Sequence, residues 1–172
     1  MSIQVLRAPS ESPNINNTDD FPGLRYAYGN RNGYVKGKGE LDYTINGSTL
    51  KIGSGRIVLQ GVECDIDANG VSITVDNVAS PRMYVVYLEV SLLSNTAAVK
   101  AVYDTSMYPD VDPGDDLNEN TTGTARMVLY QFNAISGTIS GVSKKIKELG
   151  YYPDIVAELE VDVYTGTLRA GN

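Results

Sequence analysis

The stretch LDYTINGSTLKIGSGRIVLQGVECDID, from Leu41 to Asp67, decides the fold class of this 172-residue chain. Apolar and polar residues alternate along it, which places Leu41, Tyr43 and Ile45 on one face of an extended strand. Asn46-Gly47 follows this strand. Asn-Gly between two alternating segments is a strong hairpin signal, because both turn positions need a positive φ. The stretch therefore predicts paired antiparallel strands.

The alternation continues through the rest of the chain in segments that end at turn residues. VECDI and VSITVD are separated by Asn69-Gly70, which predicts a second turn. MYVVYLEVSLL and ARMVLYQFNAI predict two long strands, and Asn95 and Gly137 mark the turns that follow them. The residues expected to point inward are Val62, Cys64, Ile66, Val71, Ile73, Val75, Tyr84, Val86, Leu88, Val90, Leu92, Val128, Tyr130, Phe132 and Ala134.

The C-terminal part of the chain holds the one helix candidate, SKKIKELG. Ser143 is a suitable N-cap and Gly150 a suitable residue to end the helix in the left-handed conformation. A helix of this length is stable only when it packs against other elements. After Pro153, IVAELEVDVYTGTL alternates again and predicts a last strand. Its inward residues are expected to be Ala157, Leu159, Val161 and Val163.

These segments together predict a mainly β chain, an antiparallel β-sandwich with an irregular N-terminal arm and one short helix. The first part of the chain differs from the rest, because APSESPNINNTDDFPG is polar and turn-rich and LRYAYGNRNGYVKGKGE is rich in glycine and tyrosine. We therefore expect an N-terminal arm over residues 1–39 and a β-sandwich domain over residues 40–172.

The composition argues against several classes of function. The formal charge of −7 argues against nucleic-acid binding, since phosphate contacts need clustered lysines and arginines. The chain has no histidine, and Cys64 is its only cysteine, so the usual general base and the usual zinc ligands are missing. No segment resembles a membrane span or a signal peptide. We expect a chain made in a cytoplasm, with no catalytic residues, no cofactor, no metal and no membrane partner.

Gly53-Ser54-Gly55 raises the question of a phosphate-binding loop. Such a loop precedes a helix N-terminus and ideally continues with Gly-Lys-Ser or Gly-Lys-Thr, whereas RIVLQG predicts a strand here. A nucleophilic Ser54 would need a base to activate it, and the chain has no histidine for that role. The sequence predicts a sharp turn between strands at this point, in a protein that is not an enzyme.

YPDVDPGDDLNEN is an acidic loop without a basic residue, and its acidic residues are Asp110, Asp112, Asp115, Asp116 and Glu119. Oxygen-rich loops of this kind can bind Ca²⁺. The EF-hand pattern fails, because Gly114 occupies the fifth position and Thr121 stands where the twelfth-position glutamate belongs. A solvated loop is the preferred interpretation, and Ca²⁺ binding in an assembled particle stays a hypothesis.

RYAYGNRNGYVKGKG interleaves basic and aromatic residues and is followed by its first acidic residue only at Glu40, so the segment itself has no acid. Two interpretations stay open side by side: a solvated loop, or docking onto an acidic face of another subunit such as the acidic loop. Stacking on single-stranded nucleic acid is the weaker alternative, because of the overall charge. The interface candidates are Arg25, Tyr26, Tyr28, Arg31, Tyr34, Lys36 and Lys38.

The chain has twelve tyrosines and no tryptophan. Most of the tyrosines, among them Tyr43, Tyr84 and Tyr130, fall on inward strand positions and are expected in the core. Tyr151 and Tyr152 are adjacent and precede a proline, so they are the candidate surface aromatics for a sugar site.

The Leu41–Asp67 stretch and the strands after it resemble the small β-sandwich module of tail-tip and baseplate proteins from siphophages of Gram-positive bacteria. The shared order is a Leu-x-Ile strand, a Gly-rich turn and a strand from Gly55 to Val62, followed by RMYVVYLEVSLL, a variable loop, ARMVLYQFNAI and TISGVSKKIKEL. The order matches over residues 40–149. The chain is similar to accessory tail-tip proteins of Bacillus siphophages and to the N-terminal shoulders domain of lactococcal phage receptor-binding proteins.

The resemblance implies a structural component of a phage tail tip or baseplate, located in the virion, that acts as an oligomeric protein–protein adaptor. Its expected partners are further copies of itself, as a dimer or trimer, and other tail-tip proteins. The arm is expected to cover an edge strand of a neighbouring copy. Receptor-binding relatives continue into a neck and a sugar-binding head, whereas this chain ends at Asn172, so we expect the attachment module alone. The alternative is a host-surface module that binds teichoic acid or another glycan during adsorption.

Overall fold

The computed structural model describes residues 3–7, 32–117, 119–120, 122–151, 159–162 and 167–170, and these ranges contain β-strands and no helix. The strands are β1 (Ile3–Arg7), β2 (Gly33–Lys36), β3 (Tyr43–Asn46), β4 (Thr49–Ile52), β5 (Gly55–Leu59), β6 (Val62–Ile66), β7 (Val71–Thr74), β8 (Arg82–Ser91), β9 (Thr96–Asp104), β10 (Thr124–Ile135), β11 (Thr138–Lys144), β12 (Glu148–Tyr151), β13 (Leu159–Asp162) and β14 (Thr167–Ala170). The prediction of a mainly β chain is confirmed.

The described strands form three larger sheets and a hairpin. The five-stranded sheet has the order β1-β6-β5-β2-β12, the four-stranded sheet β11-β10-β8-β9 and the three-stranded sheet β3-β4-β7, while β13 pairs with β14. Neighbouring strands are antiparallel except β2 and β12, which run parallel. The predicted antiparallel pairing therefore holds for most of the described strands.

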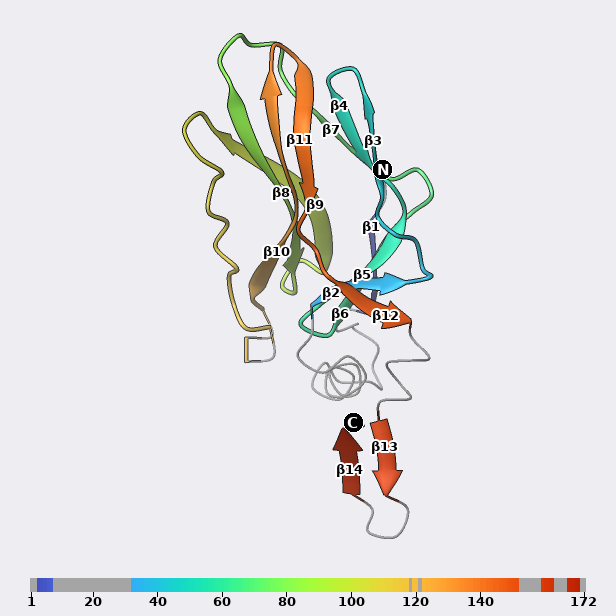
Figure 1. Cartoon of the computed structure of the whole chain (residues 1–172). Helices are drawn as coiled ribbons and strands as arrows, with labels where there is room; N and C mark the ends of the chain where they lie inside the picture. Colours follow the sequence, from blue (N-terminus) through green and yellow to red (C-terminus); the bar gives the residue numbers. More distant parts are fainter. Residues whose placement is uncertain are drawn as a thin grey trace.

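One hydrophobic core joins the three larger sheets. Figure 1 shows the four-stranded sheet on one side and the three-stranded and five-stranded sheets on the other. The core cluster takes Leu50 and Ile52 from the three-stranded sheet, Ile57 from the five-stranded sheet, and Leu88 and Phe132 from the four-stranded sheet, all with almost no exposed surface. Burial of these apolar side chains drives the layers together.

The hairpin predicted at Asn46-Gly47 is confirmed, but its loop residues lie one position later than predicted. Asn46 pairs with Thr49, so the two loop residues are Gly47 and Ser48, and Gly47 has a φ of 56°. A second two-residue loop has Gln60 and Gly61 at positive φ, as type I′ turns require. Gln60 was not predicted as a turn residue, because glutamine rarely takes this conformation.

At the predicted turn Asn69-Gly70 the chain passes from one sheet to another. Gly70 has a φ of 67° and its N–H bonds to the carbonyl of Asp67 at 2.9 Å. β6 before it belongs to the five-stranded sheet, and β7 after it pairs with β4 in the three-stranded sheet. The Gly53–Gly55 segment makes the same change of sheet between β4 and β5, which agrees with its interpretation as scaffold.

A β-bulge in β10 overturns one predicted inward residue. Val128 pairs with Tyr87 and Tyr130 pairs with Val86, which leaves Leu129 as an extra residue in β10. Leu129 is fully buried and Val128 is only half-buried, so the expectation that Val128 shares the core face with Tyr130 is wrong. An extra residue in one strand reverses the alternation of side chains beyond it.

The predicted helix from Ser143 to Gly150 is wrong. β11 runs through the start of this segment to Lys144, and β12 occupies its end. Between the two strands, the N–H groups of Lys145 and Ile146 both bond to the carbonyl of Leu129. The segment has good helix formers but is too short to hold a helix alone, so pairing with β10 and β2 decides its conformation.

The two ends of the predicted arm form strands of the five-stranded sheet. β1 pairs with β6, and β2 lies between β5 and β12. Residues 8–31, between these strands, lie outside the described residues. The single strand predicted over residues 155–168 is only partly present. β13 covers Leu159–Asp162, whereas Thr167 and Leu168 belong to β14, which pairs antiparallel with β13. Ala157 and Val163 lie outside the described residues, and the side chains of both strands are outside the description. The division into an arm and a domain stays a prediction.

Candidate docking surface

The residues predicted from the basic and aromatic segment fall into two groups. Arg25, Tyr26, Tyr28 and Arg31 lie outside the described residues, as does Tyr152, and Tyr151 is described only as the last residue of β12. Tyr34, Lys36 and Lys38 are described at or just after β2. Lys38 is exposed, whereas Tyr34 is 8% exposed and belongs to the core cluster.

Tyr34 fastens β2 to β11 and β12. Its hydroxyl donates to Oε2 of Glu148 at 3.1 Å, and Nζ of Lys144 lies 3.9 Å from the centre of its ring. Lys36 forms an ion pair with Glu148 at 3.2 Å. Burial, with Glu148 nearby, raises the pKa of Tyr34 to about 12, so the hydroxyl stays a donor. The side chain of Tyr34 therefore makes its contacts inside the fold, within one copy.

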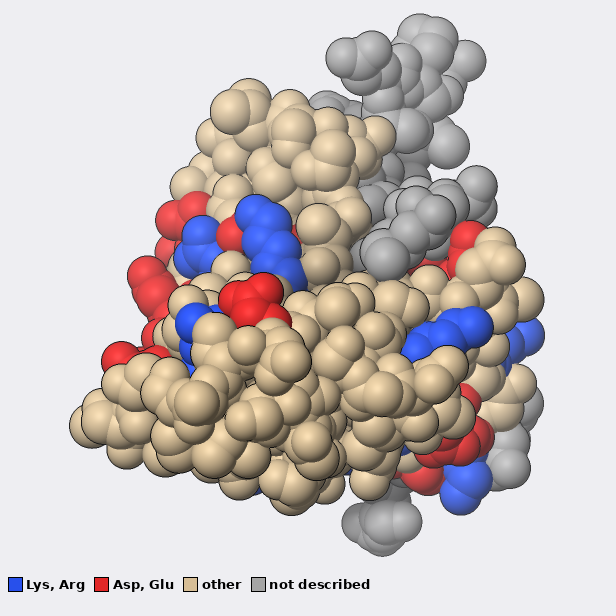
Figure 2. All heavy atoms as spheres, turned by 90° about the horizontal axis from the view of Figure 1, so that it is seen from above, with Lys and Arg blue, Asp and Glu red and all other residues tan. Residues whose placement is uncertain are grey.

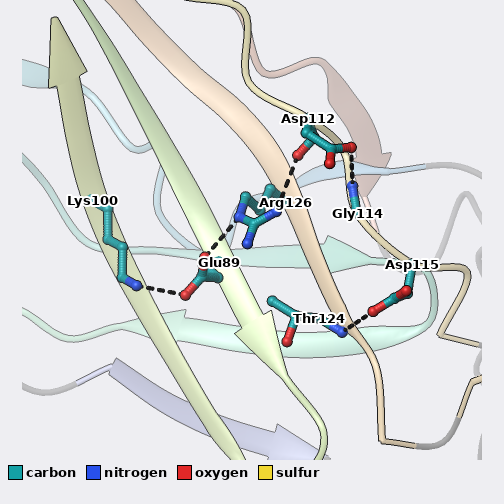
Figure 3. A network of polar contacts seen from close by, with 7 residues as sticks. All are labelled: Glu89, Lys100, Asp112, Gly114, Asp115, Thr124 and Arg126. Carbon is teal, nitrogen blue, oxygen red and sulfur yellow. Dashed lines mark hydrogen bonds and ion pairs between the residues drawn. The ribbon is translucent and has the colours of Figure 1, made fainter.

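The acidic loop binds its own backbone. Oδ1 of Asp112 accepts the N–H of Gly114 at 3.0 Å, and Oδ2 of Asp115 accepts the N–H of Thr124 at 2.7 Å. Figure 3 shows both contacts beside Arg126, which donates to the carbonyl of Asp112 at 3.5 Å. These carboxylates fix the path of the loop, which favours a structural interpretation. Within the described part of the chain, no group of three or more His, Cys, Asp or Glu residues could hold a metal ion.

The outer face of the four-stranded sheet carries an ion-pair network. Glu89 contacts Lys100 at 2.6 Å and Arg126 at 2.7 Å, as Figure 3 shows. Hydrogen bonds from Lys100 and then Arg126 hold the pKa of Glu89 below its usual range. The three residues lie on β8, β9 and β10, so the network ties three strands together across the sheet.

The inner face of the three-stranded sheet is covered unequally. Tyr43 pairs with Ile52 and Ile45 with Leu50 across β3 and β4, so the four side chains share this face. Ile52 and Leu50 are fully buried, whereas Tyr43 is 41% exposed and Ile45 is 45% exposed. The opposite layer therefore covers β4 and leaves β3 partly uncovered, although the ring of Tyr43 still meets that of Tyr130 at 5.8 Å.

Strand β3 is also an open edge. In the sheet order of the described strands, β3 has β4 on one side and no strand on the other. Edge strands offer unpaired N–H and C=O groups to another chain, and proteins usually protect them with lysine, proline, bulges or irregularity. β11, the open edge of the facing layer, has a bulge, Gly141 at positive φ and Lys144 at its end. The Tyr-Thr-Ile-Asn sequence of β3 has none of these features.

The end of the molecule next to β3 is poor in charge. Figure 2 shows mostly uncharged side chains there. The turns that meet at this end are residues 46–48, 76–81 and 135–138, and a Cβ on Gly137 would lie 3.7 Å from Ser48. Asp76 is the charged residue in these turns, and it pairs with Arg82 at 2.7 Å. For a chain with a formal charge of −7, this end is a suitable protein contact surface.

The exposure of Tyr43 corrects the prediction that it lies in the core. The alternation correctly indicates the face to which Tyr43 points, because its ring contacts buried Tyr130. Alternation cannot tell how far the opposite layer extends, so it does not separate an edge strand from a central one. The exposure of Tyr43 and Ile45 is seen only in the structure, because a short uncharged strand of β-formers has the same sequence pattern at the edge and in the centre of a sheet.

Comparisons with protein-family models, with curated proteins and with solved structures find no match for this chain. In the described part of the chain no helix is both long enough and apolar enough to cross a membrane.

Proposed function

We propose that this chain is a non-enzymatic, oligomeric protein–protein adaptor built as a β-sandwich. The observation that carries the proposal is the open edge strand β3, where Tyr43 and Ile45 stay 41% and 45% exposed. Large apolar side chains on an unprotected edge are unfavourable in water unless another chain covers them. Strand addition at such an edge is a common way for proteins to bind each other.

The ionisable groups that are most buried support a structural role. Glu63, 5% exposed, forms an ion pair with Arg56 at 3.5 Å, and Arg56 also binds Asp65 with two hydrogen bonds of 2.9 and 3.0 Å. Burial raises the pKa of Cys64 to about 12, which keeps its thiol unreactive. Each of these groups is committed to packing or pairing inside the fold.

We place the adaptor in the tail tip or baseplate of a siphophage that infects Gram-positive bacteria. This placement rests on the resemblance over residues 40–149, whose strand order includes β3 and both long strands. The proposed location is the virion, and the proposed partners are further copies of the chain and neighbouring tail-tip proteins.

Sedimentation equilibrium over a wide concentration range, from micromolar to millimolar, tests the adaptor function. We expect the sedimentation data to fit a monomer–dimer or a monomer–trimer equilibrium. The same labelled protein is then added to intact host cells. A chain that stays monomeric at every concentration and binds the cell surface would overturn the adaptor proposal in favour of glycan recognition.

A further inference from the structure

We propose that β3 of one copy pairs antiparallel with β3 of a second copy, with Tyr43 opposite Ile45, so that two three-stranded sheets join into one continuous sheet. The inference rests on the proposed adaptor function, and it names one partner that the function requires, a second copy of this chain.

The hairpin sets the direction of the backbone groups of β3. The carbonyl of Asp42, just before β3, accepts the N–H of Gly53, just after β4, at 2.7 Å. Hydrogen-bonded and non-hydrogen-bonded positions alternate along an antiparallel ladder. The N–H and C=O groups of the even-numbered residues therefore point toward β4, and those of Tyr43 and Ile45 point to the open edge.

Only one antiparallel register uses both outward residues of each copy. When Tyr43 of one copy faces Ile45 of the second, the two-fold symmetry also places Ile45 of the first copy opposite Tyr43 of the second. Each of these two pairs exchanges two backbone hydrogen bonds. Shifting the register by two residues in one direction brings in Leu41, which has a φ of 52° and is not extended. The opposite shift brings in Gly47, which lies in the hairpin loop. The strand is therefore self-complementary about Thr44.

The side chains fit this register. On the inner face, each Tyr43 would lie directly opposite an Ile45, and aromatic–β-branched pairs are among the favourable cross-strand pairs. Thr44 would face Thr44 on the outer face, and Asp42 would face Asn46, so no like charges oppose each other. The pairing covers the two exposed apolar side chains of each copy.

The absence of charge in β3 suits a contact between identical copies. The formal charge of −7 makes two copies repel each other in general, whereas Tyr43, Thr44, Ile45 and Asn46 are uncharged. Of the other edges of the larger sheets, β7 is also uncharged, but its Val71 is buried and its Ile73 is partly buried, so it leaves less apolar surface to cover. β1 ends at Arg7 and β12 begins at Glu148, β9 carries Lys100 in its middle, and β11 carries a bulge and Lys144. These features oppose pairing at those edges.

The paired strands are short, so the contact is weak by itself. Two four-residue strands bury less than the roughly 800 Å² per partner of a standard interface. We expect a dimer that dissociates on dilution and forms readily when other proteins hold two copies close together. Such a weak contact suits a component that joins a larger assembly.

Thr44→Cys tests the register directly. Residues that face each other in a non-hydrogen-bonded antiparallel pair have Cα atoms about 4.5 Å apart, within the range of a disulfide. Mild oxidation with diamide, which removes the two electrons and two protons of a pair of thiols, should link two copies through residue 44. Cys64 is fully buried and does not compete for the reaction.

Ser72→Cys is the matched control. Ser72 is exposed on β7 and lies in the same row as Thr44, because Thr44 pairs with Lys51 and Lys51 pairs with Ser72. In the proposed dimer the two Ser72 positions would be separated by five strand spacings, about 24 Å. We expect Thr44→Cys to form the linked dimer at least about tenfold faster than Ser72→Cys, since linking within a pair is intramolecular.

Ile45→Lys in the Thr44→Cys background provides the second test. A lysine at this edge should abolish the link while thermal unfolding shows that the fold is kept. Equal linking of Thr44→Cys and Ser72→Cys, or linking that survives Ile45→Lys, would overturn the β3 pairing. If the wild-type chain associates but residue 44 does not link, the pairing is wrong and the adaptor function stands. If the wild-type chain stays monomeric and residue 44 does not link, both proposals fail.

Discussion

Tyr130→Phe tests the contact that positions β3 relative to the four-stranded sheet. Tyr130 is fully buried on β10, and its hydroxyl donates to the carbonyl of Leu41, two residues before β3. Leu41 is also fully buried and has a φ of 52°, an unfavourable conformation for leucine that its surroundings must hold in place. Burial, with Asp42 nearby, raises the pKa of Tyr130, so its hydroxyl remains a donor.

The expected loss of stability follows from this geometry. Phenylalanine fills nearly the same volume, so the change removes one oxygen and leaves the carbonyl of Leu41 buried without this donor. An unsatisfied buried acceptor costs about 1–3 kcal/mol in the free energy of unfolding. For a chain of 172 residues, each kcal/mol lowers the melting temperature by about 2–4 °C.

Thermal and urea unfolding followed by circular dichroism measure this loss. Tyr43→Phe is the control, because Tyr43 is 41% exposed and water can satisfy its hydroxyl and the groups near it. We expect Tyr43→Phe to change the free energy of unfolding by no more than about 0.5 kcal/mol. If Tyr130→Phe is as stable as this control, the hydroxyl does not carry the link between β10 and the start of β3, and the reasoning is refuted.

Three further outcomes follow from the contacts inside the fold. The lowered pKa of Glu89 stabilises the folded state above the unfolded pKa of about 4.3, and this contribution is lost as the pH falls through the folded value. The difference in urea stability between wild type and Glu89→Gln should therefore shrink in acid, and a difference that does not vary with pH would contradict the network. Gly33→Ala puts a Cβ 2.3 Å from a backbone carbonyl oxygen just before β12, so we expect a loss of about 1–3 kcal/mol in thermal melts, and an unchanged melt would argue against this contact. Because burial raises the pKa of Cys64 to about 12, iodoacetamide should label this residue only after unfolding in urea, and labelling of the native chain would contradict its burial.

Local pattern predicted most of the strands and several of the turns. Tyr84, Val86, Leu88 and Val90 are buried on β8 as their alternation indicates. This prediction works because a strand that packs one face against a core needs apolar residues at every second position. The turn after β10 is found for a similar reason, since Gly137 takes a positive φ that glycine adopts at little cost.

The pattern failed where a contact distant in sequence outweighs local preference. Leu129 is an extra residue in β10, and nothing in its type distinguishes it from the regular core residues around it. The sequence predicts a helix from Ser143 to Gly150. In the fold the two ends of this segment form strands instead, because they pair with β10 and β2. The sequence predicts Tyr34 as a surface aromatic. In the fold its hydroxyl donates a hydrogen bond to Glu148, which lies more than a hundred residues later in the chain.

The sequence by itself determines that this chain forms β-strands with an apolar and a polar face, joined by tight turns. It does so because side-chain alternation and turn residues are local properties of the chain. The tertiary structure alone decides which strands are central and which are edges, since that depends on how far one layer extends over the other. The candidate docking surface depends on this second kind of information: Tyr43 and Ile45 have the same pattern as core residues, and only the end of the opposite layer leaves them exposed.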